Sequence, residues 1–169
     1  TLKLTADQLG VSGISKTYDG NAAITGTAPN TNQLTSGVLS GDNVTITATG
    51  RFNDQNVGNN KAVTINIDLT GADAKNYSLQ DSQGNPSTQV SGNIGSITQL
   101  ASVTWVGPNS GGNWSNAGNW ANGAIPTLSN VANVIIPSGV TVNYDSVAVG
   151  QIGSSITNNG VINFTGSNN

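Results

Sequence analysis

The amino-acid sequence predicts an all-β protein, and two observations support this fold class. Helix-stabilising residues are scarce, because Glu and Met are absent and Lys is rare, whereas Gly occurs 22 times beside abundant Asn, Ser and Thr. Such residues favour turns and strand surfaces over helix interiors. Apolar β-branched residues also recur at alternating positions, which is the period of half-buried strands. We therefore expect a β-sandwich followed by a smaller β module.

The first part, residues 1–101, is expected to form short strands separated by turns. Five segments have strand character: 22–27, 44–49, 62–69, 77–80 and 90–97. Turns are predicted at 20–21, 41–43, 58–60 and 84–86, where Gly and Asn cluster. A helix within 31–40 is an alternative for that segment. Short strands at this spacing predict a two-sheet sandwich.

The run Asp73-Ala-Lys-Asn-Tyr77 gives a more specific indication of the sandwich type. An acidic and a small residue just ahead of a Tyr at a strand start resemble the tyrosine corner of immunoglobulin-like sandwiches. There the ring packs in the core and the hydroxyl bonds back to the backbone. This pattern favours an Ig-like sandwich, with a β-grasp-like fold as the alternative.

The second part, residues 102–169, differs in composition. All three Trp lie between Trp105 and Trp120, and Asp145 is the single charged residue after Asp81. Short apolar segments at 140–142, 147–152 and 161–164 are separated by Gly and Asn. We expect a Trp-rich module that is the start of a β-solenoid, whose rungs need neighbours or caps to bury their faces.

The composition excludes several kinds of chemistry. The chain has no His and no Cys, so His-dependent nucleophilic catalysis and ordinary zinc sites are ruled out. A pI near 4.3 without basic clusters argues against nucleic acid, and no apolar run has the length of a membrane-spanning helix. We expect a protein that is not an enzyme and carries no cofactor.

Four segments in order carry a resemblance to a known family: 16–20 (Lys-Thr-Tyr-Asp-Gly), 34–42, 52–58 and 69–77. Together they resemble the YDG-type repeat domain of large secreted bacterial adhesins, the filamentous haemagglutinin-like exoproteins of two-partner secretion. The second part resembles Trp-rich segments of autotransporter-like proteins. The resemblance implies a non-catalytic stalk or spacer in cell adhesion or biofilm cohesion, secreted or on the bacterial surface. Its partners would be neighbouring repeats of the same, longer polypeptide.

The Trp residues are the candidate binding site. Trp105, Trp114 and Trp120 would form a carbohydrate-binding platform for host or matrix glycans if their faces were exposed. If they were buried, they would instead be core residues that close the open end of the solenoid or the seam between the two parts, since a Trp buries about 150–250 Å². The eight predicted core positions are Val44, Ile46, Val63, Ile65, Ile67, Tyr77, Trp105 and Trp120.

Three further patterns have a simple structural interpretation. Asp54 with Asn53 and Asn56 is the nearest cluster of oxygen ligands for calcium, although turn capping explains the same residues. Tyr18-Asp19-Gly20 is expected to be a tight turn with a packed ring. Four Asn-x-Ser/Thr sequons, at Asn43, Asn76, Asn113 and Asn163, are compatible with chance in so Asn-rich a chain.

Overall fold

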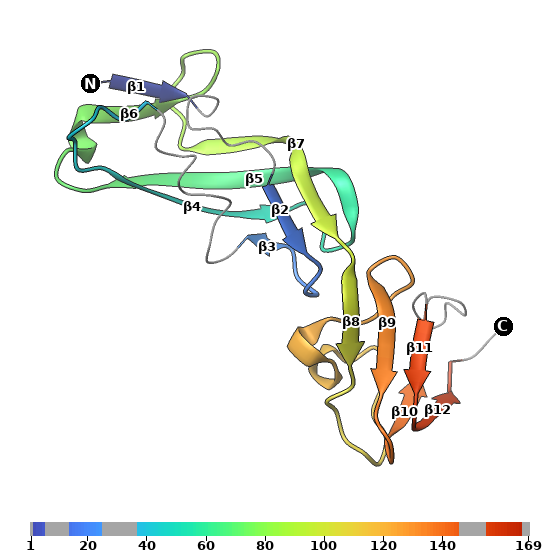
Figure 1. Cartoon of the computed structure of the whole chain (residues 1–169). Helices are drawn as coiled ribbons and strands as arrows, with labels where there is room; N and C mark the ends of the chain where they lie inside the picture. The colour runs from blue at the N-terminus through green and yellow to red at the C-terminus, as the bar shows by residue number, and fades with distance from the viewer. Residues whose placement is uncertain (1, 6–13, 25–36, 146–154, 167–169) are drawn as a thin grey trace. The chain divides into compact units, whose positions relative to one another are not determined.

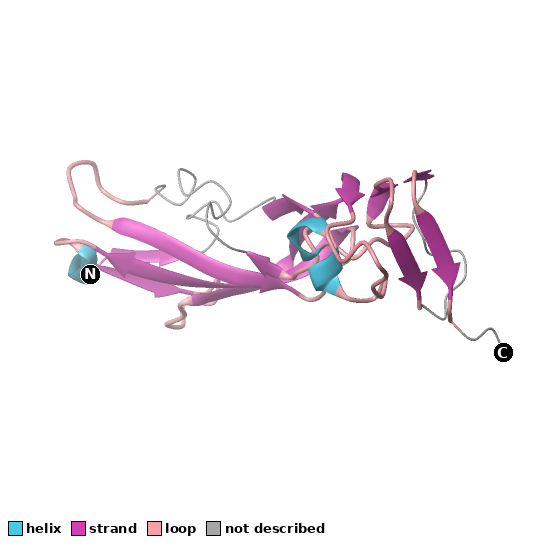
Figure 2. Cartoon of the chain, turned by 90° about the horizontal axis from the view of Figure 1, so that it is seen from below, coloured by secondary structure: helices cyan, strands magenta, loops and turns pink. Residues whose placement is uncertain are grey.

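A computed structural model describes residues 2–5, 14–24, 37–145 and 155–166 of the chain, and these residues are mostly β (Figure 1). The described part contains no α-helix, only short 3₁₀ turns, drawn in cyan in Figure 2. The strands are β1 (Leu2–Thr5), β2 (Ile14–Thr17), β3 (Ala23–Ile24), β4 (Thr45–Phe52), β5 (Gly58–Thr70), β6 (Tyr77–Gln80), β7 (Gln89–Thr98), β8 (Leu100–Thr104), β9 (Val131–Ile136), β10 (Thr141–Tyr144), β11 (Ser155–Asn158) and β12 (Val161–Phe164). The 3₁₀ turns are η2 (Ala74–Asn76), η3 (Ala117–Asn119) and η4 (Ala121–Gly123).

The chain folds into two compact units that do not follow a single cut in the sequence. Unit 1 comprises Thr1–Ser15, Ala22–Asp54 and Gly58–Ser96. Unit 2 comprises Ile97–Asn169 together with two short segments from earlier in the chain, Lys16–Asn21 and Gln55–Val57. The sequence-based division into residues 1–101 and 102–169 stays a prediction.

Strand β5 is at the centre of unit 1. It pairs antiparallel with β4 from Thr45↔Thr70 to Phe52↔Val63, and the five-stranded sheet has the order β2-β7-β5-β4-β3. β1 and β6 form a separate parallel pair. Along β5 buried and exposed residues alternate, so that Val63, Ile65 and Ile67 face the core, as predicted.

Most of the strands predicted for unit 1 are present. β6 has the predicted bounds 77–80, while β4, β5 and β7 extend beyond theirs. The turn predicted at 58–60 is wrong, because these residues begin β5, where Asn60 takes the left-handed conformation with φ 52°. Residues 25–27 of one predicted strand and 31–36 of the possible helix lie outside the described residues.

Unit 2 is built from parallel strands. β9 lies between β8 and β11, with Val103↔Val134 and Val134↔Ile156 in register. β10 pairs with β12 from Thr141↔Val161 to Tyr144↔Phe164. The consecutive strands β9 and β10 are therefore both followed, farther along the chain, by parallel partners. The predicted segment 147–152 falls outside the described residues.

The buried side chains agree with most of the predicted core. Seven of the eight predicted positions are buried, and the eighth, Val44, is half-buried. Buried polar groups are satisfied: no buried side-chain nitrogen or oxygen of the described residues lacks a hydrogen-bond partner. The buried polar residues of unit 2, Asn119 and Asn130, were not predicted.

Candidate functional site

The three Trp side chains form one buried cluster in unit 2. Trp105, Trp114 and Trp120 are 3%, 2% and 1% exposed. Trp120 is in contact with both of the others in edge-to-face geometry, at centroid distances of 5.1 Å from Trp105 and 4.6 Å from Trp114. Edge-to-face packing adds to the stabilisation that burial provides.

Hydrogen bonds fix the orientation of each indole. The Trp120 Nε1 donates to the carbonyl of Trp114 at 2.8 Å, and the Trp114 Nε1 donates to the carbonyl of Pro126 at 3.1 Å. The Trp105 Nε1 donates to the carbonyl of Pro108. A carbohydrate platform needs exposed ring faces, and none of these rings presents one. The glycan-binding prediction has no support in this arrangement, whereas the core interpretation agrees with it.

Trp114 also begins an aromatic column that continues through two further strands. Its ring lies 5.1 Å from that of Tyr144, and Tyr144 lies 5.5 Å from Phe164. The preceding Asn residues are aligned in the same way, by a parallel bridge Asn113↔Asn143 and the pair Asn143↔Asn163. Three successive levels of unit 2 therefore carry the same Asn-aromatic pair in register.

This register exposes a repeat that the sequence reading missed. Residues 113–115, 143–145 and 163–165 read Asn-Trp-Ser, Asn-Tyr-Asp and Asn-Phe-Thr. Two of these tripeptides are sequons, so the sequons at Asn113 and Asn163 have a structural explanation in this repeat. Aligning the second part on Trp114, Tyr144 and Phe164, three of its five aromatic residues, would have found it.

Asp145 connects two of these three levels by hydrogen bonds. Its carboxylate accepts hydrogen bonds from the Ser115 backbone N–H at 2.9 Å and from the Ser115 hydroxyl at 2.6 Å. Burial acts to raise the pKa of Asp145, but the bonds from Ser115 outweigh it and the pKa lies below its ordinary value. The charged form of Asp145 is thus the form that the fold stabilises.

The candidate calcium ligands are engaged in other contacts. The Asp54 carboxylate forms an ion pair with Lys61 at 2.7 Å, and Lys61 is itself buried. The side-chain oxygen of Asn56 accepts a hydrogen bond from Asn130 at 3.0 Å, and Asn53 is exposed. Within the described ranges, no group of three or more acidic side chains could hold a metal ion.

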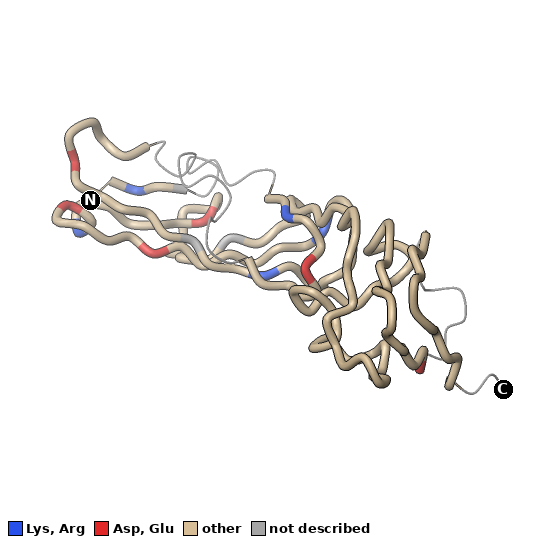
Figure 3. Tube along the Cα trace, turned by 60° about the horizontal axis from the view of Figure 1, so that its bottom comes forward, with Lys and Arg blue, Asp and Glu red and all other residues tan. Residues whose placement is uncertain are grey.

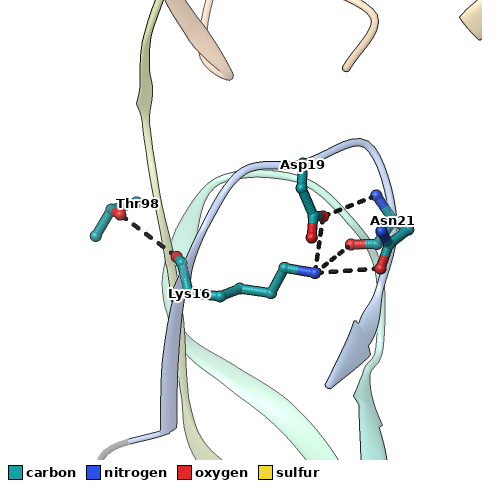
Figure 4. Close-up of polar contacts among 4 residues, drawn as sticks. All are labelled: Lys16, Asp19, Asn21 and Thr98. Atoms are coloured by element: carbon teal, nitrogen blue, oxygen red, sulfur yellow. Dashed lines mark hydrogen bonds and ion pairs between the residues drawn. The ribbon is translucent and has the colours of Figure 1, made fainter. Parts of the chain in front are cut away.

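Residues 18–20 bend between β2 and β3, and Asp19 contacts Lys16 and Asn21 there (Figure 4). The Asp19 carboxylate pairs with Lys16 at 2.7 Å and accepts from the backbone N–H of Asn21. The Lys16 ammonium also donates to the carbonyl and side-chain oxygens of Asn21. Asp19 therefore stabilises its own turn, as the sequence predicts.

Tyr18 is a buried residue whose hydroxyl bonds within unit 2. It is 2% exposed and belongs to unit 2, where its hydroxyl donates to the carbonyl of Ile125 at 2.8 Å. Burial raises the pKa of Tyr18, while a hydrogen bond to Asn130 opposes the rise. The expected packing of this ring is confirmed by its burial, and the partner of its hydroxyl lies in the second part of the chain.

Unit 1 contains a second polar cluster, at the start of β6. The Tyr77 hydroxyl donates to the Asp42 carboxylate at 2.6 Å and accepts from the Leu39 N–H at 2.9 Å. Asp73 accepts from the backbone N–H of Asn43 at 2.8 Å. The bond to Asp42 is the main cause of the raised pKa of Tyr77. Segments 34–42 and 69–77 of the resemblance thus meet at one corner.

A shallow groove of about 370 Å³ lies beside this corner. Ile67, Leu69, Tyr77 and Leu79 form its apolar lining, and Asp68 and Lys75 are also among the residues around it. The lining has a single carboxylate, so it does not provide the carboxylate pair of a glycosidase.

Charged residues are sparse along the described part of the chain (Figure 3). The chain has five Lys or Arg and eight acidic residues, and unit 2 beyond Ile97 holds Asp145 alone. No basic patch suited to phosphate recognition follows from this distribution. Among the described helices none is both long and apolar enough to cross a membrane.

Comparison with protein families identifies the first part of the chain. Residues 2–84 match the YDG domain, which includes Tyr18-Asp19-Gly20 and the corner at Tyr77. No curated protein and no solved structure matches the chain.

Proposed function

Starting from the YDG domain at residues 2–84, we propose that the chain is a non-catalytic stalk or spacer of a large bacterial adhesin. The adhesin would be secreted or attached to the cell surface and would serve cell adhesion or biofilm cohesion. The observation that carries the proposal is the use of the polar groups: Asp19, Asp42, Asp54 and Asp145 each hold a turn, a buried cation or a neighbouring strand. These four carboxylates stabilise the fold through hydrogen bonds and ion pairs.

The parallel register of unit 2 supports a finer description of this part as the start of a β-solenoid. β9 and β10 together form one coil. β9 pairs in parallel with β11, and β10 pairs in parallel with β12. The spacing between paired residues is about 20 to 30 residues, which is typical of one solenoid turn. A stack of this kind lengthens by adding coils and is suited to a spacer.

For unit 1 we favour the Ig-like sandwich over the β-grasp-like fold. Its support is the antiparallel β3-β4-β5 pairing together with the Tyr77 hydroxyl, which accepts from the backbone N–H of Leu39. In a tyrosine corner the hydroxyl bonds to the backbone a few residues upstream. Tyr77 resembles it in bonding to backbone, although Leu39 lies 38 residues upstream.

Two experiments test the functional proposal. Antibodies raised against the chain should label intact cells or the culture medium of the source bacterium, and labelling of the cytosol alone would contradict it. A glycan array with the wild-type chain should show no specific binding. Binding that a Trp114→Phe variant retains would place a ligand site outside the Trp cluster and would overturn the pure spacer role.

A further inference from the structure

We propose that the Tyr18-Asp19-Gly20 turn is a docking plug: an element of the YDG domain that completes the fold of the β module following it. The plug fits a glycine-containing 3₁₀ turn that is followed by a buried Asn. In this chain the turn is η4 with residues 124–125, and the buried Asn is Asn130. This role is separate from the adhesin proposal, because it concerns the motif itself and holds wherever the protein is located.

Tyr18 provides the first contact of the plug. Its side chain is 2% exposed, its hydroxyl donates to the Ile125 carbonyl at 2.8 Å, and its backbone N–H donates to the Thr98 carbonyl at 2.9 Å. The neighbouring Pro126 carbonyl accepts from Trp114. Adjacent carbonyls therefore connect the motif to the buried Trp cluster.

Gly20 provides the second contact, by close approach of two backbones. Its φ is 78°, and a Cβ added to it would lie 2.3 Å from the Gly123 carbonyl oxygen and 3.2 Å from the Ala124 Cα. Backbone atoms cannot turn aside as a flexible side chain can. Glycine is thus required at position 20 both for its backbone conformation and for contact with η4.

Asn130 provides a third contact, to another segment of the YDG domain. It is 2% exposed, its Oδ1 accepts from the Val57 N–H at 2.8 Å, and its Nδ2 donates to Asn56 at 3.0 Å. Its side chain also hydrogen-bonds to the Tyr18 phenol. One buried amide thereby holds residues 55–57 and Tyr18 in unit 2.

The chemistry of these contacts defines the partner. Ile125 and Thr98 contact the motif through carbonyl oxygens and Gly123 through its backbone, while Asn130 contacts it through its side-chain amide. Recognition of the motif thus depends on the backbone conformation of η4 and on the position of the Asn130 side-chain amide. Modules of different sequence that share these two features would accept the same plug.

The first test compares two glycine substitutions in the full chain. Gly20→Ala and the control Gly139→Ala both place Ala at a φ near 78°, but nothing lies within 4 Å of the Cβ position at Gly139. Both sites are in unit 2, as are all three Trp residues, so Trp emission during urea unfolding reports this unit. We expect Gly20→Ala to lower the midpoint about twofold more than Gly139→Ala does. Equal shifts would overturn the proposal.

The second test covers the case in which Gly20→Ala does not fold. Tyr18→Phe and the control Tyr77→Phe each remove one hydroxyl from a buried ring, in unit 2 and unit 1 respectively. Amide hydrogen exchange of peptides covering residues 120–131 should be about fivefold faster in Tyr18→Phe, as the loss of one hydrogen bond predicts. In Tyr77→Phe these peptides should exchange as in the wild type. Unchanged exchange in Tyr18→Phe, or equal acceleration in both variants, contradicts docking.

Discussion

At the scale of single residues, stability in unit 1 depends on a few aliphatic side chains along β5. Ile65 is 2% exposed, between Val63 and Ile67 on the same face. Ile65→Ala should lower the free energy of unfolding by about 2–5 kcal/mol, because it removes buried methyl groups and leaves a cavity. Asn66→Ala, on the exposed face of the same strand, is the control and should change it by about 0.5 kcal/mol or less. Urea denaturation measures both, and equal losses would mean that the core lies elsewhere.

Glycine at 160 illustrates how a single residue permits two coils to stack. A Cβ at this position would lie 2.3 Å from the Val140 carbonyl oxygen and 2.8 Å from that of Pro137. Gly160→Ala should therefore separate the β11-β12 corner from the β9-β10 corner. We expect faster amide exchange at Val161, whose N–H donates to the Val140 carbonyl, while β4 and β5 keep wild-type exchange. Wild-type exchange at Val161 would refute the close stacking.

At the scale of elements, the bond between Asp145 and Ser115 couples two levels of unit 2 and makes this coupling sensitive to acid. The pKa of Asp145 is depressed in the folded state, so its contribution to stability is present above the ordinary value of 3.8 and is lost as the pH falls through the folded pKa. For the wild type, Trp emission should report a lower midpoint of urea unfolding below about pH 4 than at neutral pH. Asp145→Asn should have a lower midpoint at neutral pH and a smaller acid dependence. An equally steep acid decline in the variant would assign the effect to other carboxylates.

At the scale of the whole molecule, the local order of apolar and polar residues predicted the features that depend on neighbouring residues alone. Alternation identified the buried face of β5, and β6 and β12 have the predicted bounds. The prediction of a turn at Gly58–Asn60 is wrong because Asn60 adopts a positive φ within a strand. A segment rich in Gly and Asn therefore did not form a turn. The partner of Tyr18 could not be predicted, since its acceptor is the backbone carbonyl of Ile125, far along the chain, and a carbonyl leaves no signal in the sequence. The aromatic column was readable in principle but requires the strand register to recognise it.

Two of the buried tyrosines, Tyr18 in unit 2 and Tyr77 in unit 1, also give both units a common alkaline limit. The pKa values of Tyr18, mainly through burial, and of Tyr77, mainly through its bond to Asp42, are raised in the folded state. Below the ordinary value of 10.0 both states keep the phenol protons and stability does not depend on these groups. Above it the unfolded chain releases protons first, so stability falls as the pH rises towards the folded pKa values. A Tyr18→Phe, Tyr77→Phe double variant should therefore show a flatter decline of the urea midpoint between about pH 9 and pH 11 than the wild type. Parallel declines would show that groups other than these two phenols set the alkaline limit.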